Sequence, residues 1–107
     1  MNKELAKQAV ACKRWRWMAG MLTINGTRIQ RTPNVEITAA WPDLDDPATL
    51  GCLLALVRKA WGDCTIWTMV DVDCDEGAWI CTGLEVGEIG SGYSEAHALV
   101  AALEAAP

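Results

Sequence analysis

Residues 46–62, with the sequence DPATLGCLLALVRKAWG, carry the strongest secondary-structure signal in the chain. Asp46 suits a helix N-cap, Pro47 suits the first helical position, and Gly62 suits the residue that stops a helix. The apolar residues between them recur at helical spacing, at Leu50, Leu53, Leu54, Val57 and Trp61. This pattern predicts a helix over 47–61 that packs its apolar stripe across a sheet. Leu54→Ala is then expected to destabilise the fold by roughly 2–5 kcal/mol.

The sequence after this helix predicts two strands and a last helix. Residues 65–72 (TIWTMVDV) and 78–86 (AWICTGLEV) are rich in β-branched and aromatic side chains and are separated by a turn-forming segment. The segment GEIGSG at 87–92 is predicted to be a glycine-rich connection. Ser94 suits the N-cap of a helix over roughly 95–105.

The sequence before residue 46 predicts one helix and three short strands. Residues 3–13 have helical character, and residues 14–17 (RWRW) alternate strictly, as a strand does. Asn25-Gly26 predicts a hairpin with a two-residue turn, whose buried face holds Leu22, Ile24, Thr27 and Ile29. Residues 35–41 (VEITAAW) alternate in the same way and predict a third strand.

These elements together predict the fold class. The expected architecture is α+β, with residues 1–107 forming a single domain. It is a two-layer sandwich in which a small antiparallel sheet of about four to five strands packs on the central 47–61 helix, flanked by N- and C-terminal helices.

Composition and charge exclude several classes of protein. An apolar fraction of 51% excludes intrinsic disorder, and no apolar run reaches the length of a membrane span. The first residues, MNKELAKQAV, lack the apolar stretch of a signal peptide, so a cytoplasmic location is expected. The net charge of −5 argues against direct binding of nucleic acid, which needs a dense positive field.

Charge is unevenly divided along the chain. Residues 1–31 contain seven basic side chains and one acid, a net charge of +6, whereas residues 32–107 carry −11. The chain also has six Trp, one Tyr and no Phe. Complementary charge and abundant indole surface favour a homo-oligomer, most simply a dimer.

Residues that could bind a metal or catalyse a reaction do not form a recognisable motif. The five cysteines include no C-x-x-C pair and there is one histidine, so reduced, buried thiols are expected and zinc is not. The run Asp71, Asp73, Asp75 resembles the start of a calcium loop, but Glu76 and Thr82 occupy its sixth and twelfth positions. We therefore predict no enzymatic activity, no cofactor and no metal site.

The segment from Lys13 to Trp17 has the chemistry of an anion-binding site. Arginine pairs with phosphate through its guanidinium fork, and an indole can stack on a base. The candidate ligand-binding residues are Arg14, Trp15, Arg16, Trp17 and, across the predicted hairpin, Arg28. A second interpretation places both indoles in the core and the cations in solvent, because strict alternation separates the two residue types.

Three stretches resemble small uncharacterised proteins of tailed phages and prophages. They are RWRWMAGM at 14–21, DLDDPATLGCLLALVRKAWG at 43–62 and EAHALVAALEAAP at 95–107. The resemblance implies an accessory protein of α/β/α-sandwich character in the cytoplasm of an infected bacterium. It supplies no catalytic residues.

The resemblance and the residues together give one function hypothesis and two alternatives. The hypothesis is a non-enzymatic phage accessory protein that acts in counter-defence by sequestering a small anionic, nucleotide-like immune signal of the host. One alternative is an acidic inhibitor that mimics nucleic acid and binds a host defence protein. The other is a structural or regulatory accessory of the phage. None of these roles requires a membrane.

Overall fold

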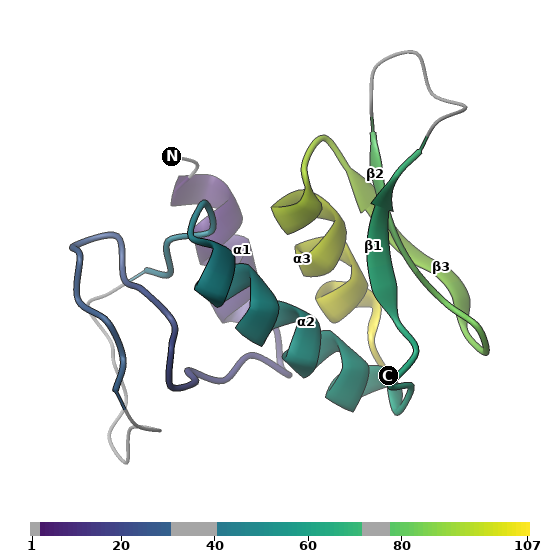
Figure 1. Cartoon of the computed structure of the whole chain (residues 1–107), viewed down its shortest axis with the longest axis horizontal. Helices are drawn as coiled ribbons and strands as arrows, with labels where there is room; N and C mark the ends of the chain where they lie inside the picture. The colour runs from purple at the N-terminus through teal and green to yellow at the C-terminus, as the bar shows by residue number, and fades with distance from the viewer. Residues whose placement is uncertain (1–2, 31–40, 72–77) are drawn as a thin grey trace.

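Three helices and three strands make up the fold, in a computed structural model that describes residues 3–30, 41–71 and 78–107 (Figure 1). The elements in chain order are α1 (Lys3–Ala11), α2 (Pro47–Trp61), β1 (Trp67–Val70), β2 (Trp79–Gly83), β3 (Gly87–Gly92) and α3 (Glu95–Ala105). The strands form one antiparallel sheet in the order β1-β2-β3. The α+β class is therefore confirmed, whereas the predicted four to five strands are not. Residues 35–40 of one predicted strand lie outside the described residues.

Helix α2 begins and ends where the sequence predicts. The Asp46 carboxylate accepts the backbone N–H of Thr49 at 3.0 Å, and Gly62 ends the helix in the left-handed conformation, with φ at 66°. Its buried residues are Thr49, Leu53, Leu56 and Val57. The predicted stripe is thus rotated, because Leu54 and Trp61 lie at the margin of the buried face and are half-buried.

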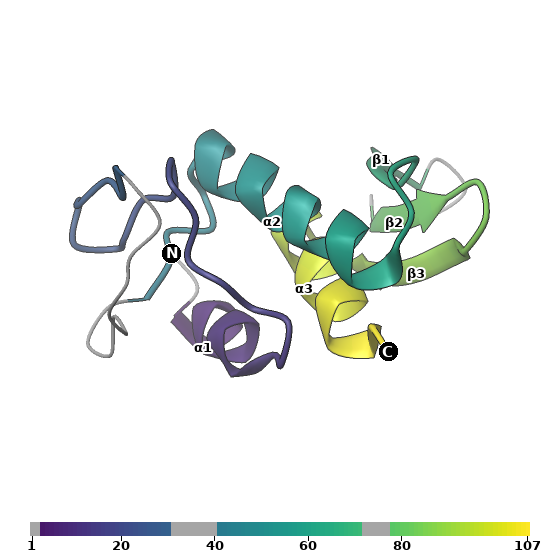
Figure 2. The same cartoon turned by 90° about the horizontal axis from the view of Figure 1, so that it is seen from below.

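The central helix of the fold is α3, not α2. It lies between the sheet on one side and α1 and α2 on the other (Figures 1 and 2). Its buried residues are Ala96, Ala98, Leu99, Val100, Ala102 and Leu103, so it is apolar around most of its circumference, as a helix enclosed on several sides must be. Helix α2 packs on α3, and the prediction that its stripe crosses the sheet is wrong.

Strand β3 occupies the segment predicted as a connection. A Cβ atom added at Gly90 would lie 2.7 Å from the backbone nitrogen of Ala102 in α3, and closer still to the Ala98 carbonyl. A Cβ atom at Gly92 would collide with the Cβ of His97. These glycines do not break the strand; they let β3 and α3 approach closely.

Residues 12–30 form turns instead of the predicted strands. Residues 14–17 have no regular structure, and the 22–28 hairpin is reduced to a single bridge between Leu22 and Arg28. The Thr23 N–H donates to the Thr27 carbonyl at 2.9 Å, so the turn contains three residues, not two. This shift by one residue reverses the faces: Met21 and Thr23 are buried, whereas Leu22 and Ile24 are only half-buried.

Helix α1 is short and packs on α3. It ends at Ala11, two residues before the predicted boundary, and buries Leu5, Ala6 and Ala9. The small side chains on this face allow the two helices to lie close together. This packing brings the residues that follow α1 beside the C-terminal end of α3 (Figure 2).

Candidate functional site

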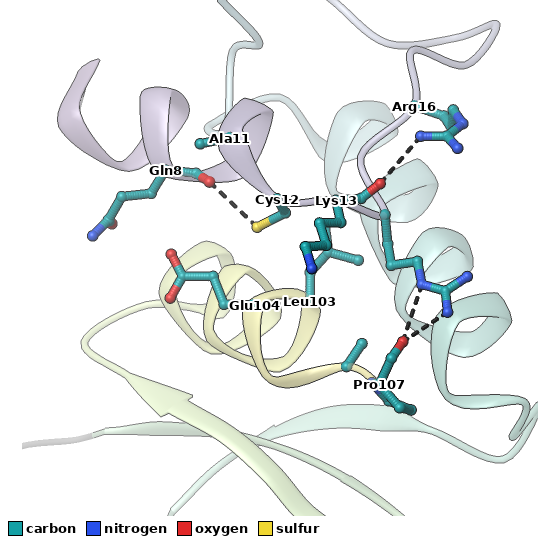
Figure 3. Close-up of a pocket in the computed structure, with 10 residues that line it drawn as sticks. Gln8, Ala11, Cys12, Lys13, Arg16, Leu103, Glu104 and Pro107 are labelled. Carbon is teal, nitrogen blue, oxygen red and sulfur yellow. Dashed lines mark hydrogen bonds between the residues drawn. The ribbon is translucent and has the colours of Figure 1, made fainter.

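An open groove of about 730 Å³ lies between the end of α1, the chain that follows it and the end of α3 (Figure 3). Gln8, Ala11, Cys12, Lys13, Arg14, Arg16, Leu103, Glu104, Ala106 and Pro107 line it. Three of these side chains are cationic and one is anionic. The groove therefore combines the size of a small-molecule site with an excess of cationic side chains.

Arg14 spans the groove from the N-terminal segment to the end of α3. Its Nε and Nη2 donate to the main-chain oxygen of Pro107 at 3.2 and 2.7 Å (Figure 3). The side chain is exposed, and the group that holds it belongs to the main chain and not to an Asp or Glu side chain. The fold thus positions this guanidinium without an acidic side chain against it.

Arg16 is held by the turn from which it projects. Its Nη1 donates to the Trp15 carbonyl at 2.7 Å and to the Lys13 carbonyl at 3.3 Å. Among the residues the structure describes, neither Arg16 nor Lys13 forms an ion pair. In the same part of the chain, none of the three groove cations has an Asp or Glu carboxylate within ion-pair distance.

The two indoles of this segment do not line the groove. Trp15 is 7% exposed and belongs to the hydrophobic core, while Trp17 is half-buried and packs against that core. Their rings meet edge to face with centroids 5.5 Å apart. The second interpretation, which placed both indoles in the core, is therefore confirmed for Trp15 but not for the half-buried Trp17. The buried Trp15 ring is not open to a base.

Arg28 does not line the groove and forms an ion pair with Asp46. Its Nη1 donates to Asp46 Oδ2 at 2.7 Å and to the Gly20 carbonyl at 2.8 Å, and its Nη2 donates to Asp46 Oδ1 at 3.3 Å. This hydrogen-bonded pair raises the pKa of Arg28 and lowers the pKa of Asp46 to about 2. Arg28 supports the N-cap of α2, so the structure does not bring it together with Arg14 and Arg16.

Cys12, on the groove wall, is a poor nucleophile. Burial, followed by the nearby Glu104 carboxylate, raises the pKa of its thiol to about 11. The thiol donates to the Gln8 carbonyl at 3.3 Å. Because the thiolate is the reactive form, the groove offers charge and shape to a ligand but no activated sulfur.

The Ser94 hydroxyl lies 2.7 Å from Nδ1 of His97, a pairing that resembles part of a catalytic dyad. The same oxygen accepts the His97 backbone N–H at 3.2 Å, which is the contact of a helix N-cap. The two residues are neighbours on the first turn of α3, so their proximity follows from the cap that the sequence predicts.

Two further features concern metals and membranes. Within residues 3–30, 41–71 and 78–107, no three His, Cys, Asp or Glu side chains are grouped as metal ligands. In the same part of the chain, none of the helices has both the length and the apolar character that crossing a bilayer requires.

Comparisons of the chain with protein-family models, with curated proteins and with solved structures find no match.

Part of this site is visible in the sequence, and the rest is not. Lys13, Arg14 and Arg16 are close together in the sequence, so their grouping is visible as a basic segment. The other wall, with Glu104 and Pro107, comes from the end of α3 and joins the groove only through tertiary packing. No local pattern in the sequence indicates it.

Proposed function

We propose that this chain is a non-enzymatic binding protein that holds a small, phosphate-bearing anion in the groove lined by Lys13, Arg14 and Arg16. The observation that carries the proposal is the set of three cations that share one concave surface and, among the described residues, pair with no Asp or Glu side chain. Guanidinium groups bind phosphate through paired hydrogen bonds, and an ammonium adds a point charge.

The positions of the arginines favour binding of a ligand. The main-chain oxygen of Pro107 fixes one guanidinium, and the Trp15 and Lys13 carbonyls fix the other. Side chains that are ordered before a ligand arrives lose less conformational entropy on binding. Each guanidinium also has more donors than these contacts use, so both can still bind an anion.

The groove supports recognition of phosphate more than recognition of a base. Trp15 lies in the core, and neither Trp15 nor Trp17 lines the groove. Arg28, which the sequence suggested as a third cation, is paired with Asp46. The proposed ligand is therefore a compact phosphate compound such as a nucleotide, held by its phosphates.

Calorimetric titration tests the proposal. Linear and cyclic nucleotides and pyrophosphate are titrated into the wild type and into an Arg14→Ala/Arg16→Ala variant. We expect at least one nucleotide to bind the wild type with Kd below about 100 μM, a free energy near −5.5 kcal/mol. The double variant should bind at least tenfold more weakly, because it lacks the two guanidinium groups that would donate hydrogen bonds to the phosphate.

A matched control uses a cation outside the groove. Lys59 is exposed on α2, so Lys59→Ala changes the net charge without touching the groove and should leave affinity unchanged. If no nucleotide binds the wild type with a Kd below about 100 μM, sequestration is rejected and the acidic, protein-binding alternative is favoured. Binding that survives in the double variant would place the ligand at another site.

The biological setting stays a prediction. The resemblance to phage accessory proteins suggests that the anion is a host signal in an infected bacterium and that its removal is a counter-defence. Expression of the chain in a bacterium with a nucleotide-signalled defence tests this setting. The prediction requires that protection of the phage be lost with Arg14→Ala/Arg16→Ala and kept with Lys59→Ala.

A further inference from the structure

Strand β1 is an open edge of the sheet with apolar side chains on it. The sheet order β1-β2-β3 leaves one side of β1 without a strand in the described part of the chain (Figure 1). Trp67, Met69 and Val70 are 37%, 40% and 41% exposed. Three of the large hydrophobic side chains at the surface thus occupy a single four-residue strand.

The hydrogen bonds of the β1–β2 ladder show which backbone groups are free. The Asp71 N–H donates to the Ala78 carbonyl at 2.6 Å, so these residues form a hydrogen-bonded pair. Such pairs alternate along an antiparallel ladder, so Met69 and Trp67 also direct their backbone groups at β2. Thr68 and Val70 therefore direct their N–H and C=O groups toward the open edge.

The two faces of β1 differ. The Thr68 hydroxyl donates to Glu95 Oε1 on α3 at 2.8 Å, so Thr68 points to the covered face of the sheet. Trp67 and Met69 then point to the opposite face, since successive side chains of a strand alternate. No described helix covers that face (Figures 1 and 2).

The opposite edge of the sheet is protected and β1 is not. Strand β3 carries the charged Glu88, several glycines, and a register shift opposite Cys81 and Thr82. Charges and bulges are the usual means by which edge strands avoid pairing with another chain. The β1 sequence WTMV contains no charge, no proline and no glycine.

We propose that β1 pairs with β1 of a second copy of this chain, antiparallel and centred on Met69. In this register Thr68 of each copy lies opposite Val70 of the other, and their free N–H and C=O groups form four hydrogen bonds. The Ile66 carbonyl already accepts a hydrogen bond from Arg58 Nε at 2.8 Å, and it takes no part in these four hydrogen bonds.

The same register also matches the side chains. Met69 of one copy faces Met69 of the other in a non-hydrogen-bonded pair, where side chains are closest. The exposed edge is therefore complementary to itself, which is the property of a twofold interface. The two sheets join into one continuous sheet, and the interface uses none of the residues that line the cationic groove.

Sedimentation equilibrium over a concentration series tests the pairing. Because the contact is one short strand with its side chains, we expect a concentration-dependent dimer of twice 11.6 kDa. Val70→Pro removes an edge N–H and leaves the β2 hydrogen bonds intact, so it should be monomeric with an unchanged circular dichroism spectrum. Leu84→Lys, in the exposed β2–β3 turn, is the matched surface control and should dimerise like the wild type.

A charge pair tests the register. Met69→Lys and Met69→Glu, each alone, place like charges face to face and should be monomeric. Mixed in equal amounts, they should form a heterodimer, because the introduced ammonium of one variant then faces the introduced carboxylate of the other. A wild type that remains at 11.6 kDa at every concentration overturns the proposal. So does a Val70→Pro variant that dimerises, or a mixture of charged variants that stays monomeric.

Discussion

The Arg28 guanidinium and the Asp46 carboxylate connect the turn region before α2 to the N-terminus of that helix. Their closest atoms, Nη1 and Oδ2, are 2.7 Å apart. The same carboxylate accepts the backbone N–H and the hydroxyl of Thr49 at 3.0 and 2.9 Å. Asp46 thus serves both as a helix cap and as the anchor of a segment that has little regular structure of its own.

Stability should fall in acid as Asp46 is protonated. The hydrogen-bonded Arg28 holds the pKa of Asp46 at about 2, below the ordinary value of 3.8. Because the folded pKa is the lower one, the ionised carboxylate stabilises the fold above about pH 4, and this contribution is lost as the pH falls toward 2. Thermal unfolding of the wild type and of Asp46→Asn between pH 5 and pH 2 measures the effect.

Asp46→Asn keeps the capping oxygen but removes the ion pair. The variant should melt at a lower temperature than the wild type at pH 5, and the difference should shrink as the pH approaches 2. Asp45→Asn is the control, since it removes an exposed charge one residue away. Parallel melting curves for the wild type and Asp46→Asn at every pH would show that the pair contributes no pH dependence.

Gly90→Ala should separate β3 from α3. The added Cβ would lie 2.7 Å from the Ala102 nitrogen, a backbone atom that cannot move unless the helix shifts. We expect a loss of about 1–3 kcal/mol in the free energy of unfolding, measured by urea denaturation. Gly51→Ala, on the exposed face of α2 with nothing within 4 Å, should instead stabilise the protein by about 0.5–1 kcal/mol. Equal effects of the two substitutions would contradict the packing described for α3.

Replacing Leu53 by alanine should destabilise the fold more than replacing its neighbour Leu54. Leu53 is fully buried on the inner face of α2, so Leu53→Ala should cost about 2–5 kcal/mol in unfolding free energy. Leu54 is half-buried at the margin of the helix face, so Leu54→Ala should cost less. Urea denaturation of both variants decides between this orientation and the sequence-based stripe, which expects the full loss of about 2–5 kcal/mol for Leu54→Ala.

The helices can be predicted from sequence because their end signals are local. Asp46, Gly62 and Ser94 act within one turn of the residues they cap, so α2 and α3 have their expected bounds. Strand β3 cannot be predicted, because Gly90 and Gly92 suggest a loop until α3 is in place against them. The hairpin register is not predictable either, because Asn25-Gly26 indicates a turn but does not fix its length.

The candidate site, like the fold, can be predicted from the sequence only in part. The basic segment is visible in the sequence, and the alternation of Arg and Trp correctly predicts exposed arginines and a buried Trp15, whereas Trp17 is only half-buried. The pairing of Arg28 with Asp46 joins positions far apart in the chain, and nothing near either residue indicates it. Local chemistry therefore identifies the cations, and tertiary packing decides which of them remain available to a ligand.

Alkylation should distinguish the cysteines by burial. Cys64 is exposed, contrary to the prediction of uniformly buried thiols, whereas Cys81 is fully buried. Burial raises the pKa of Cys81 to about 11, so little thiolate forms at pH 8 and the reagent cannot reach it. Mass spectrometry after brief treatment of the native protein with iodoacetamide should find Cys64 modified well before Cys81. In denaturant the two should react at similar rates, which controls for the reagent. Early modification of Cys81 in the native state would mean that the sheet opens away from α3, since Cys81 lies opposite Thr68, on the face of the sheet that α3 covers.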